Sequence, residues 1–167
     1  MNPARAAELA AKLIRNFNEV PLERYTREPL YGGEGSRLAP GTAARKLGAS
    51  YDVLEPGKRS CPYHLHHAQE EMFVILQGSG TLRVAGEMIP VKAGDVIFIP
   101  PGPEYPHQII NSSDAQLKYL SVSTKEMPEI CEYPDSGKYQ AEAGVEREGR
   151  FAVISRQENL EYWDGEP

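Results

Sequence analysis

The sequence predicts an all-β fold, a small antiparallel sandwich or barrel with an N-terminal helix and extended arms. Three observations support this class. Short segments with strand-like alternation follow one another closely, turn-forming residues separate them, and no helical period occurs between them. We expect strands at residues 49–54, 71–77, 81–84, 87–91, 95–99, 108–110 and 117–124.

The N-terminal segment is expected to form a helix. Asn2 can cap it, Pro3 suits its first turn, and apolar residues recur at three- and four-residue spacing as far as Phe17. The helix should end before Pro21. Residues 20–44 hold many glycines and prolines that break any period, so we expect an irregular arm that wraps the barrel or faces a partner.

Turn chemistry separates the expected strands in order along the chain. Glycine, proline, asparagine and aspartate gather between them, where their backbone preferences or their lack of an amide donor favour a turn. These turns lie at 56–57, 78–80, 85–86, 93–95, 100–103 and 111–114.

The length of 167 residues suits one domain with its own core. We expect a single domain over residues 1–167, with the barrel core at about 46–124 and the helix and arm at 1–45. The tail, residues 125–167, offers one further strand at 151–155.

Composition argues against two classes of partner. Asp and Glu number 24 against 18 Lys and Arg, a formal net charge of −6, so nucleic acid and anionic membranes are not expected to bind. No apolar run approaches the ~20 residues of a membrane helix, and charges interrupt the first twenty residues, so we expect neither a membrane span nor a signal peptide. A cytoplasmic location is expected, with Cys61 and Cys131 as reduced thiols.

Three of the four histidines lie close together, at His64, His66 and His67. Side chains alternate along a strand, so His64 and His66 should face one side and His67 the other. Two imidazoles on one face at this spacing can bind one metal ion. The remaining histidine, His107, follows a proline-rich turn at the start of an expected strand.

Two motifs contain these histidines, and through them the chain resembles the cupins, in particular single-domain microbial cupins of type 2 and of the sugar-phosphate isomerase kind. The first cupin motif is Gly, five residues, His-x-His, three or four residues, Glu, six residues, Gly. Its counterparts here are Gly57, His64, His66, Glu71 and Gly78. The second motif is Gly, five residues, Pro-x-Gly, two residues, His, three residues, Asn. Its counterparts are Gly94, Pro100, Gly102, His107 and Asn111.

The chain departs from the cupin spacing twice. Six residues separate Gly57 from His64 where the motif has five, and four separate Gly102 from His107 where the motif has two. The loop before His107 is therefore longer, and the extra pair is most simply Glu104-Tyr105.

The resemblance implies four metal ligands: His64, His66, Glu71 and His107. Glu71 is preferred to Glu70 because only Glu71 keeps six residues before the motif's final glycine. Three imidazoles and a carboxylate favour one divalent transition metal ion, with zinc, iron, manganese and nickel all open. A six-coordinate ion would leave two positions for a substrate, whereas tetrahedral zinc would leave none unless its coordination expands.

The resemblance implies a double-stranded β-helix, a jelly-roll barrel with the metal at its mouth. We expect an enzyme for a small oxygen-rich metabolite, with sugar-phosphate isomerase-like chemistry. An iron-dependent dioxygenase and a non-catalytic small-molecule binding or sensing protein are the alternatives. The expected catalytic groups are Glu104 and Tyr105, the acid–base candidates nearest in sequence to the ligands. The nearest cations for a phosphate are Lys58 and Arg59.

A homodimer is also expected. A short barrel leaves sheet edges and an apolar outer face, which a second copy commonly covers. The arm at residues 20–44 could supply such a cover.

Overall fold

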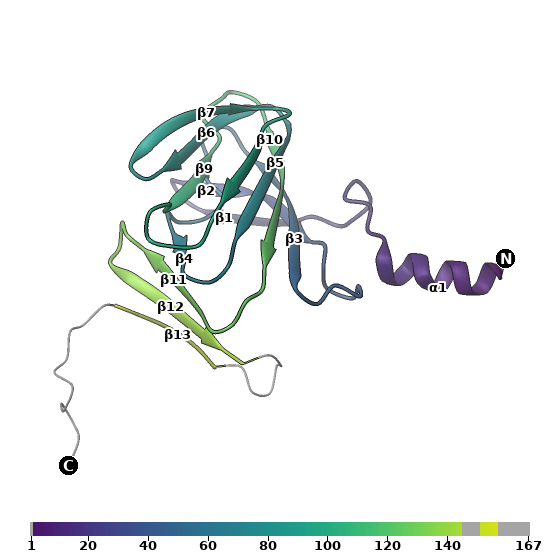
Figure 1. The fold of residues 1–167 in the computed structure, drawn as a ribbon. Coiled ribbons are helices and arrows are strands. Elements are labelled where there is room, and N and C mark those ends of the chain that lie inside the picture. The colour runs from purple at the N-terminus through teal and green to yellow at the C-terminus, as the bar shows by residue number, and fades with distance from the viewer. Residues whose placement is uncertain (1, 145–150, 157–167) are drawn as a thin grey trace, which may run out of the picture.

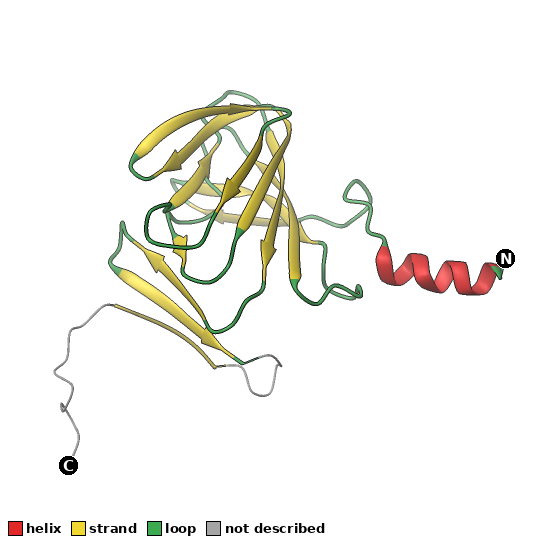
Figure 2. Cartoon of the chain, viewed as in Figure 1, coloured by secondary structure: helices red, strands yellow, loops and turns green. Residues whose placement is uncertain are grey.

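The structure is a computed structural model that describes residues 2–144 and 151–156. Residues 1, 145–150 and 157–167, which include much of the predicted tail, lie outside the described residues. The described chain is a β-barrel with one helix beside it and a smaller sheet beneath it (Figures 1 and 2). The predicted all-β barrel with an N-terminal helix is confirmed.

Helix α1, Pro3–Leu13, begins where the sequence predicts. The side-chain oxygen of Asn2 accepts hydrogen bonds from the backbone amides of Ala4 and Arg5 at 3.1 and 3.2 Å, which satisfies two donors of the first turn. None of the helix residues is buried, and the helix extends away from the barrel (Figure 1). Within the residues that the structure describes, no helix is long and apolar enough to cross a membrane.

The main sheet has six strands, and their chain order differs from their order in space. From edge to edge they are β1 Glu23–Arg27, β2 Tyr31–Arg37, β3 Leu47–Leu54, β10 Leu117–Thr124, β5 Glu71–Gln77 and β8 Val96–Ile99. All neighbours are antiparallel. The long central strands β3, β10 and β5 form the wall that carries the inward-facing residues of the site.

The expectation of an irregular arm at residues 20–44 is wrong for its central part. This segment forms the hairpin β1–β2, and β2 pairs with β3 of the same chain. A Cβ atom at Gly33 would lie 2.5 Å from the carbonyl oxygen of Val53, closer than a real side chain can approach. Glycine is therefore needed here so that the strands can pack closely, and it does not end the strand.

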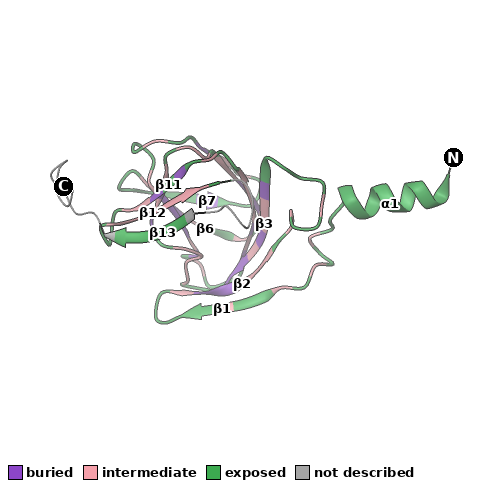
Figure 3. Ribbon diagram, turned by 90° about the horizontal axis from the view of Figure 1, so that it is seen from below, coloured by how far each residue is buried: buried purple, intermediate pink, exposed green. Residues whose placement is uncertain are grey.

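A second layer of three strands packs against the main sheet, in the order β7 Glu87–Lys92, β6 Ser79–Val84 and β9 His107–Ile110. Ala85 and Gly86 join β6 to β7 with positive φ angles of 49° and 84°, as a two-residue hairpin turn requires. Apolar side chains of both layers form the buried core: Leu54, Phe73, Ile75, Leu82, Val91, Ile99, Ile109, Leu117 and Tyr119. Figure 3 shows the contrast between buried positions of β3 and the exposed edge strand β1.

The tail contributes a third sheet, of which the sequence predicted only the last strand. Its order is β13 Phe151–Arg156, β12 Lys138–Ala143, β11 Glu129–Tyr133 and β4 Leu65–His66. Strands β11 and β12 were not predicted. Through β11 the tail pairs directly with the short strand that carries His66.

Candidate metal centre and barrel mouth

Three separate segments bring three histidines and one glutamate together. His66 lies in β4, Glu71 begins β5 and His107 begins β9. His64 precedes β4 and forms an antiparallel bridge with His107, with backbone N···O distances of 3.1 and 2.7 Å. The bridge fixes two of the imidazoles side by side, with ring centroids 4.6 Å apart.

One carboxylate oxygen, Oε2 of Glu71, lies at the centre of this group. The Nε2 atoms of His107, His66 and His64 lie 2.8, 3.5 and 3.8 Å from it. Donors bound at about 2.1 Å to one ion lie about 3.0–3.4 Å from one another, a range that the three observed distances bracket. His64, Glu71 and His107 form a set of donors that could hold a metal ion.

In the protein without metal, burial and hydrogen bonds shift the pKa values of Glu71, His64 and His66. Burial opposes ionisation of Glu71, but hydrogen bonds with His107 and His66 hold the pKa of its carboxyl well below its usual range. Burial lowers the pKa of His64 to about 4. Burial also opposes the charge of His66, yet hydrogen bonds with Glu129 and Glu71 raise its pKa to about 9. An ion that binds His66 must therefore displace a proton.

Glu129, on β11, holds β4 in place, the strand that carries His66. Sequence reasoning missed this residue. It is 4% exposed, and its Oε1 lies 3.2 Å from Nδ1 of His66. Its two oxygens also accept hydrogen bonds from the backbone amides of His67, Ala68 and Gln69 at 2.9–3.1 Å. By binding Nδ1, Glu129 leaves Nε2 of His66 directed at Glu71. No local pattern links it to a histidine 63 positions away.

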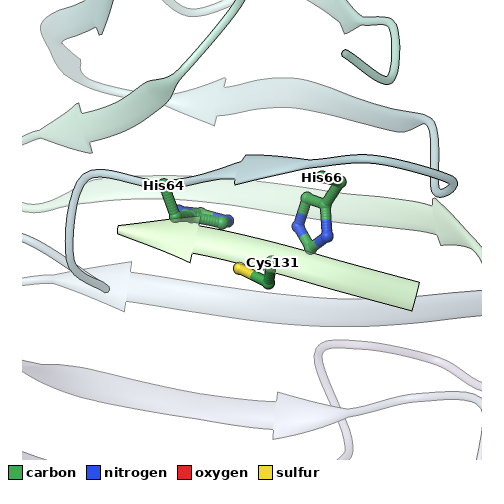
Figure 4. Close-up of side chains that lie close together, drawn as sticks. All are labelled: His64, His66 and Cys131. Atoms are coloured by element: carbon green, nitrogen blue, oxygen red, sulfur yellow. The ribbon is translucent and has the colours of Figure 1, made fainter. Parts of the chain in front are cut away.

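Cys131, also on β11, lies close to His64 and His66 (Figure 4). Its Sγ and one ring nitrogen each of His64 and His66 lie within 4.8 Å of one another, and His64, Glu71 and His107 form a second set of this kind. Burial raises the pKa of the Cys131 thiol to about 11, so it is protonated at neutral pH without a metal. Both cysteines are free thiols.

Two residues beside the motif, His67 and Glu70, lie outside the cluster formed by His64, His66, Glu71 and His107. His67 Nε2 lies 2.8 Å from Oε1 of Glu132, on the outside, as strand alternation predicts. Glu70 is exposed, and its backbone amide donates to Oγ1 of Thr124. The structure thus separates His67 from the three histidines around Glu71.

The lengthened loop at residues 101–106 lies beside β4, the strand that carries His66. The backbone amide of Gly102 donates to the carbonyl oxygen of His66 at 2.8 Å, and the carbonyl oxygen of Tyr105 lies 3.2 Å from Nδ1 of His107. The side chains of Glu104 and Tyr105 are exposed. The loop backbone therefore contacts the cluster, while these two side chains extend to solvent.

A cavity of about 560 Å³ opens on the main sheet, and the four candidate ligands are not among the residues that line it. Ser123 and Ser121 of β10 line it, and in the sheet they lie directly opposite Glu71 and Phe73 of β5. Opposite residues share a face of the sheet, so the cavity and Glu71 lie on the same inner face. A second cavity, of about 600 Å³, shares Ser50 and Arg37 with the first.

Lys58 and Arg59, the cations nearest to the motif in sequence, are not among the residues that line the two cavities. Lys58 donates to Oε2 of Glu28 at 2.7 Å and to the carbonyl oxygen of Pro29 at 2.9 Å, so its charge is paired. Neither Lys58 nor Arg59 lines either cavity. These two cations, the nearest to the motif in sequence, therefore lie outside both cavities.

Comparison with known proteins shows which proteins the chain resembles. The sequence model of the cupin domain matches residues 50–123. The structure resembles a sugar phosphate isomerase of the cupin superfamily from Silicibacter pomeroyi, with a TM-score of 0.72, 24% identity, and coverage of 93% of this chain and 95% of that one. It also resembles a proposed sugar phosphate isomerase from Acidithiobacillus ferrooxidans, with a TM-score of 0.70, 26% identity, and coverage of 81% and 86%.

A curated relative from Thermotoga maritima, an oxalate-binding protein, is 38% identical over 69 residues, which are 41% of this chain and 54% of the relative. A second curated relative is covered to 46%. The chain thus spans about half the length of these two curated relatives.

Proposed function

Residues 50–123 form a cupin domain on a cupin-superfamily fold, and from this premise we propose that the protein is a metal-dependent isomerase of a small phosphorylated sugar. The observation that carries the proposal is the convergence of three imidazole Nε2 atoms on Oε2 of Glu71. The 26% identity with a proposed sugar phosphate isomerase supports the same substrate class.

In this proposal His64, His66, Glu71 and His107 hold one divalent ion, which would polarise a substrate carbonyl or hydroxyl. The protein itself holds these donor atoms in fixed positions. The backbone bridge between His64 and His107 sets two rings, and Glu129 fixes the third through Nδ1 of His66.

Isomerisation of an aldose to a ketose moves a proton between adjacent carbons, so a group other than a metal ligand must accept and return it. Glu104 and Tyr105 are candidates on the loop that contacts the cluster. The structure adds Asp52 on β3, a half-buried carboxyl that lines the second cavity. Burial raises the pKa of Asp52, in the direction that suits an acid–base group.

The test uses protein stripped of metal and reloaded separately with zinc, manganese, iron or nickel. Aldose and ketose phosphates would be screened in deuterium oxide by proton NMR. We expect product together with deuterium at the carbon that exchanges its proton, and loss of both in His107→Ala. Dioxygen uptake by the iron form without isomerisation would contradict the proposal and favour a dioxygenase.

The second candidate is a non-catalytic binding protein for a small oxygen-rich anion. Its support is the 38% identity, over 69 residues, with an oxalate-binding protein. Saturable binding of oxalate by the metal-loaded protein, without turnover of any sugar phosphate, would favour this candidate.

A further inference from the structure

We propose that the cavity of about 560 Å³ on the inner face of the main sheet binds a phosphate group through Arg37, Arg45 and Lys125. The identity of the phosphorylated ligand, a small sugar phosphate, rests on the proposed function. The site itself is argued from the charges, the cavity and the sheet register.

Three separate segments supply the cations. Arg37 ends β2, Arg45 lies just before β3, and Lys125 directly follows β10. All three line the cavity of about 560 Å³, where Glu142 is the one described carboxylate in the lining. Two positive charges are therefore in excess, which matches the charge of a phosphate monoester at neutral pH.

Several surface cations of the described chain have a carboxylate partner. Arg24, Lys58 and Arg83 each form an ion pair at 2.6–2.8 Å. Over residues 2–144 and 151–156, no ion pair involves any of the three cations of the cavity. Unpaired charges in a concave site concentrate positive potential and attract anions.

The sheet register connects the cations to Glu71. One row of opposite residues crosses the sheet as Arg37, Ser50, Ser121 and Phe73. The adjacent row is Gly48, Ser123 and Glu71. A ligand could thus place its phosphate among the cations at the rim, accept hydrogen bonds from the serine hydroxyls, and extend toward Glu71.

Gly48 keeps the path between the two rows open. A Cβ atom there would lie 2.9 Å from Oγ of Ser123 and 2.9 Å from Cε of Lys125. Any larger residue would press on two groups that line the cavity. The absence of a side chain at this position leaves the serine and the lysine accessible.

The test measures binding of inorganic phosphate to metal-free full-length protein by calorimetry at low ionic strength. We expect one site, with affinity reduced about tenfold in each of Arg37→Gln, Arg45→Gln and Lys125→Met, because each loses one charge-assisted contact. Arg45→Lys should retain most of the affinity. Arg27→Gln is the matched control, since Arg27 lines neither cavity. Thermal unfolding establishes that each variant is folded.

The outcomes separate this inference from the proposed function. Phosphate binding that depends on the three cations supports the site even if no sugar phosphate is isomerised. Absence of phosphate binding, or binding that all three variants leave unchanged, overturns the site even if isomerase activity is found. Acetate binding as tight as phosphate overturns the assignment to phosphate and indicates a carboxylate site.

Discussion

At the scale of single residues, Glu71 and His67 show how one short segment divides its side chains between two environments. Oε2 of Glu71 faces three imidazoles, whereas His67 Nε2 faces Glu132 outside the cluster. The two histidines His66 and His67 are adjacent in sequence but on opposite sides of the strand. His67 is therefore an internal control for the proposed ligands.

We expect His64→Ala, His66→Ala and His107→Ala each to lower metal affinity by at least about 100-fold, above the effect usual for a residue that only contacts a ligand. Each removes one of four donors. His67→Ala should leave metal content unchanged, as measured by elemental analysis after equilibrium dialysis. Equal losses for His67→Ala and His64→Ala would contradict the ligand assignment. Glu71→Gln should weaken binding more than Glu70→Gln.

A second prediction concerns Asp52, whose carboxyl accepts a hydrogen bond from Ser50 at 2.6 Å. Burial raises its pKa, and a carboxyl with a raised pKa favours the folded state below its unfolded pKa and loses that contribution as pH rises through the folded pKa. We expect Asp52→Asn to increase the free energy of unfolding at pH 7 by about 1 kcal/mol. At pH 3 both side chains are neutral, so the difference should vanish.

Urea unfolding of both proteins at the two pH values measures this effect. A variant that is more stable at pH 7 and also inactive would mark Asp52 as a group kept for chemistry at a cost in stability. A less stable variant at pH 7 would show that the carboxylate is favourably placed for folding and contradict the prediction.

At the scale of elements, β11 holds β4 in place. Strand β4 has two residues, pairs with β11, and is anchored through Glu129. We expect Glu129→Gln to lower metal affinity about 10- to 100-fold with little change in global fold, because a neutral amide binds Nδ1 of His66 less strongly. Metal titration followed by calorimetry, with circular dichroism for the fold, measures it. Glu132→Gln, at the His67 contact, is the matched control and should have no effect.

The loop at residues 101–106 is the next element with a testable role. Its three prolines fix backbone φ angles, and Gly102 ties it to His66. If Glu104 or Tyr105 transfers a proton, Glu104→Gln or Tyr105→Phe should reduce turnover about 100-fold while metal content stays intact. Steady-state kinetics with metal analysis measures both quantities. Two silent variants would leave the loop a spacer and favour Asp52 as the acid–base group.

Sequence patterns predicted the central strands and missed strands that lack apolar side chains facing the core. β5 and β10 have the predicted bounds, 71–77 and 117–124, because both are rich in apolar residues, of which Phe73 and Ile75 in β5 and Leu117 and Tyr119 in β10 are buried in the core. The hairpin β1–β2 was missed because glycines such as Gly33 indicate turns in sequence but allow close strand packing in space. β12 was missed because its largely polar sequence lacks a buried face and owes its pairing to β11 and β13.

The candidate site was predictable to the same extent. The motif spacing alone predicts the candidate ligands His64, His66, Glu71 and His107 from the sequence. Glu129 and the cations of the cavity come from separate segments, and only the fold places them beside the motif residues. Their sequence neighbourhoods contain no chemistry that distinguishes them from ordinary surface charges.

At the scale of the whole molecule, we retain the prediction of a homodimer, now on a different surface. The hairpin β1–β2 covers an edge of its own barrel, and β8 is an edge strand of the main sheet. On β8, Val96 and Phe98 are 48% and 66% exposed. An edge strand with exposed apolar residues is a surface that a second copy can cover.

Light scattering at micromolar concentration should give twice the mass of one chain, and Phe98→Glu should return it to a monomer. Leu13→Glu on α1, also exposed, is the matched control and should remain dimeric. A monomeric mass for the unaltered protein would contradict the prediction. A monomer produced only by Leu13→Glu would move the interface to the helix.

The pairing of β4 with β11 has a thermodynamic consequence for the molecule. The strand that presents His66 is completed by a segment more than sixty positions later, so the site is whole only when the C-terminal sheet is docked. Ion occupancy and docking of that sheet are therefore linked, and linkage is reciprocal. In the proposed site, an ion that binds the cluster would stabilise the pairing of β11 with β4, and loss of that pairing would weaken binding of the ion.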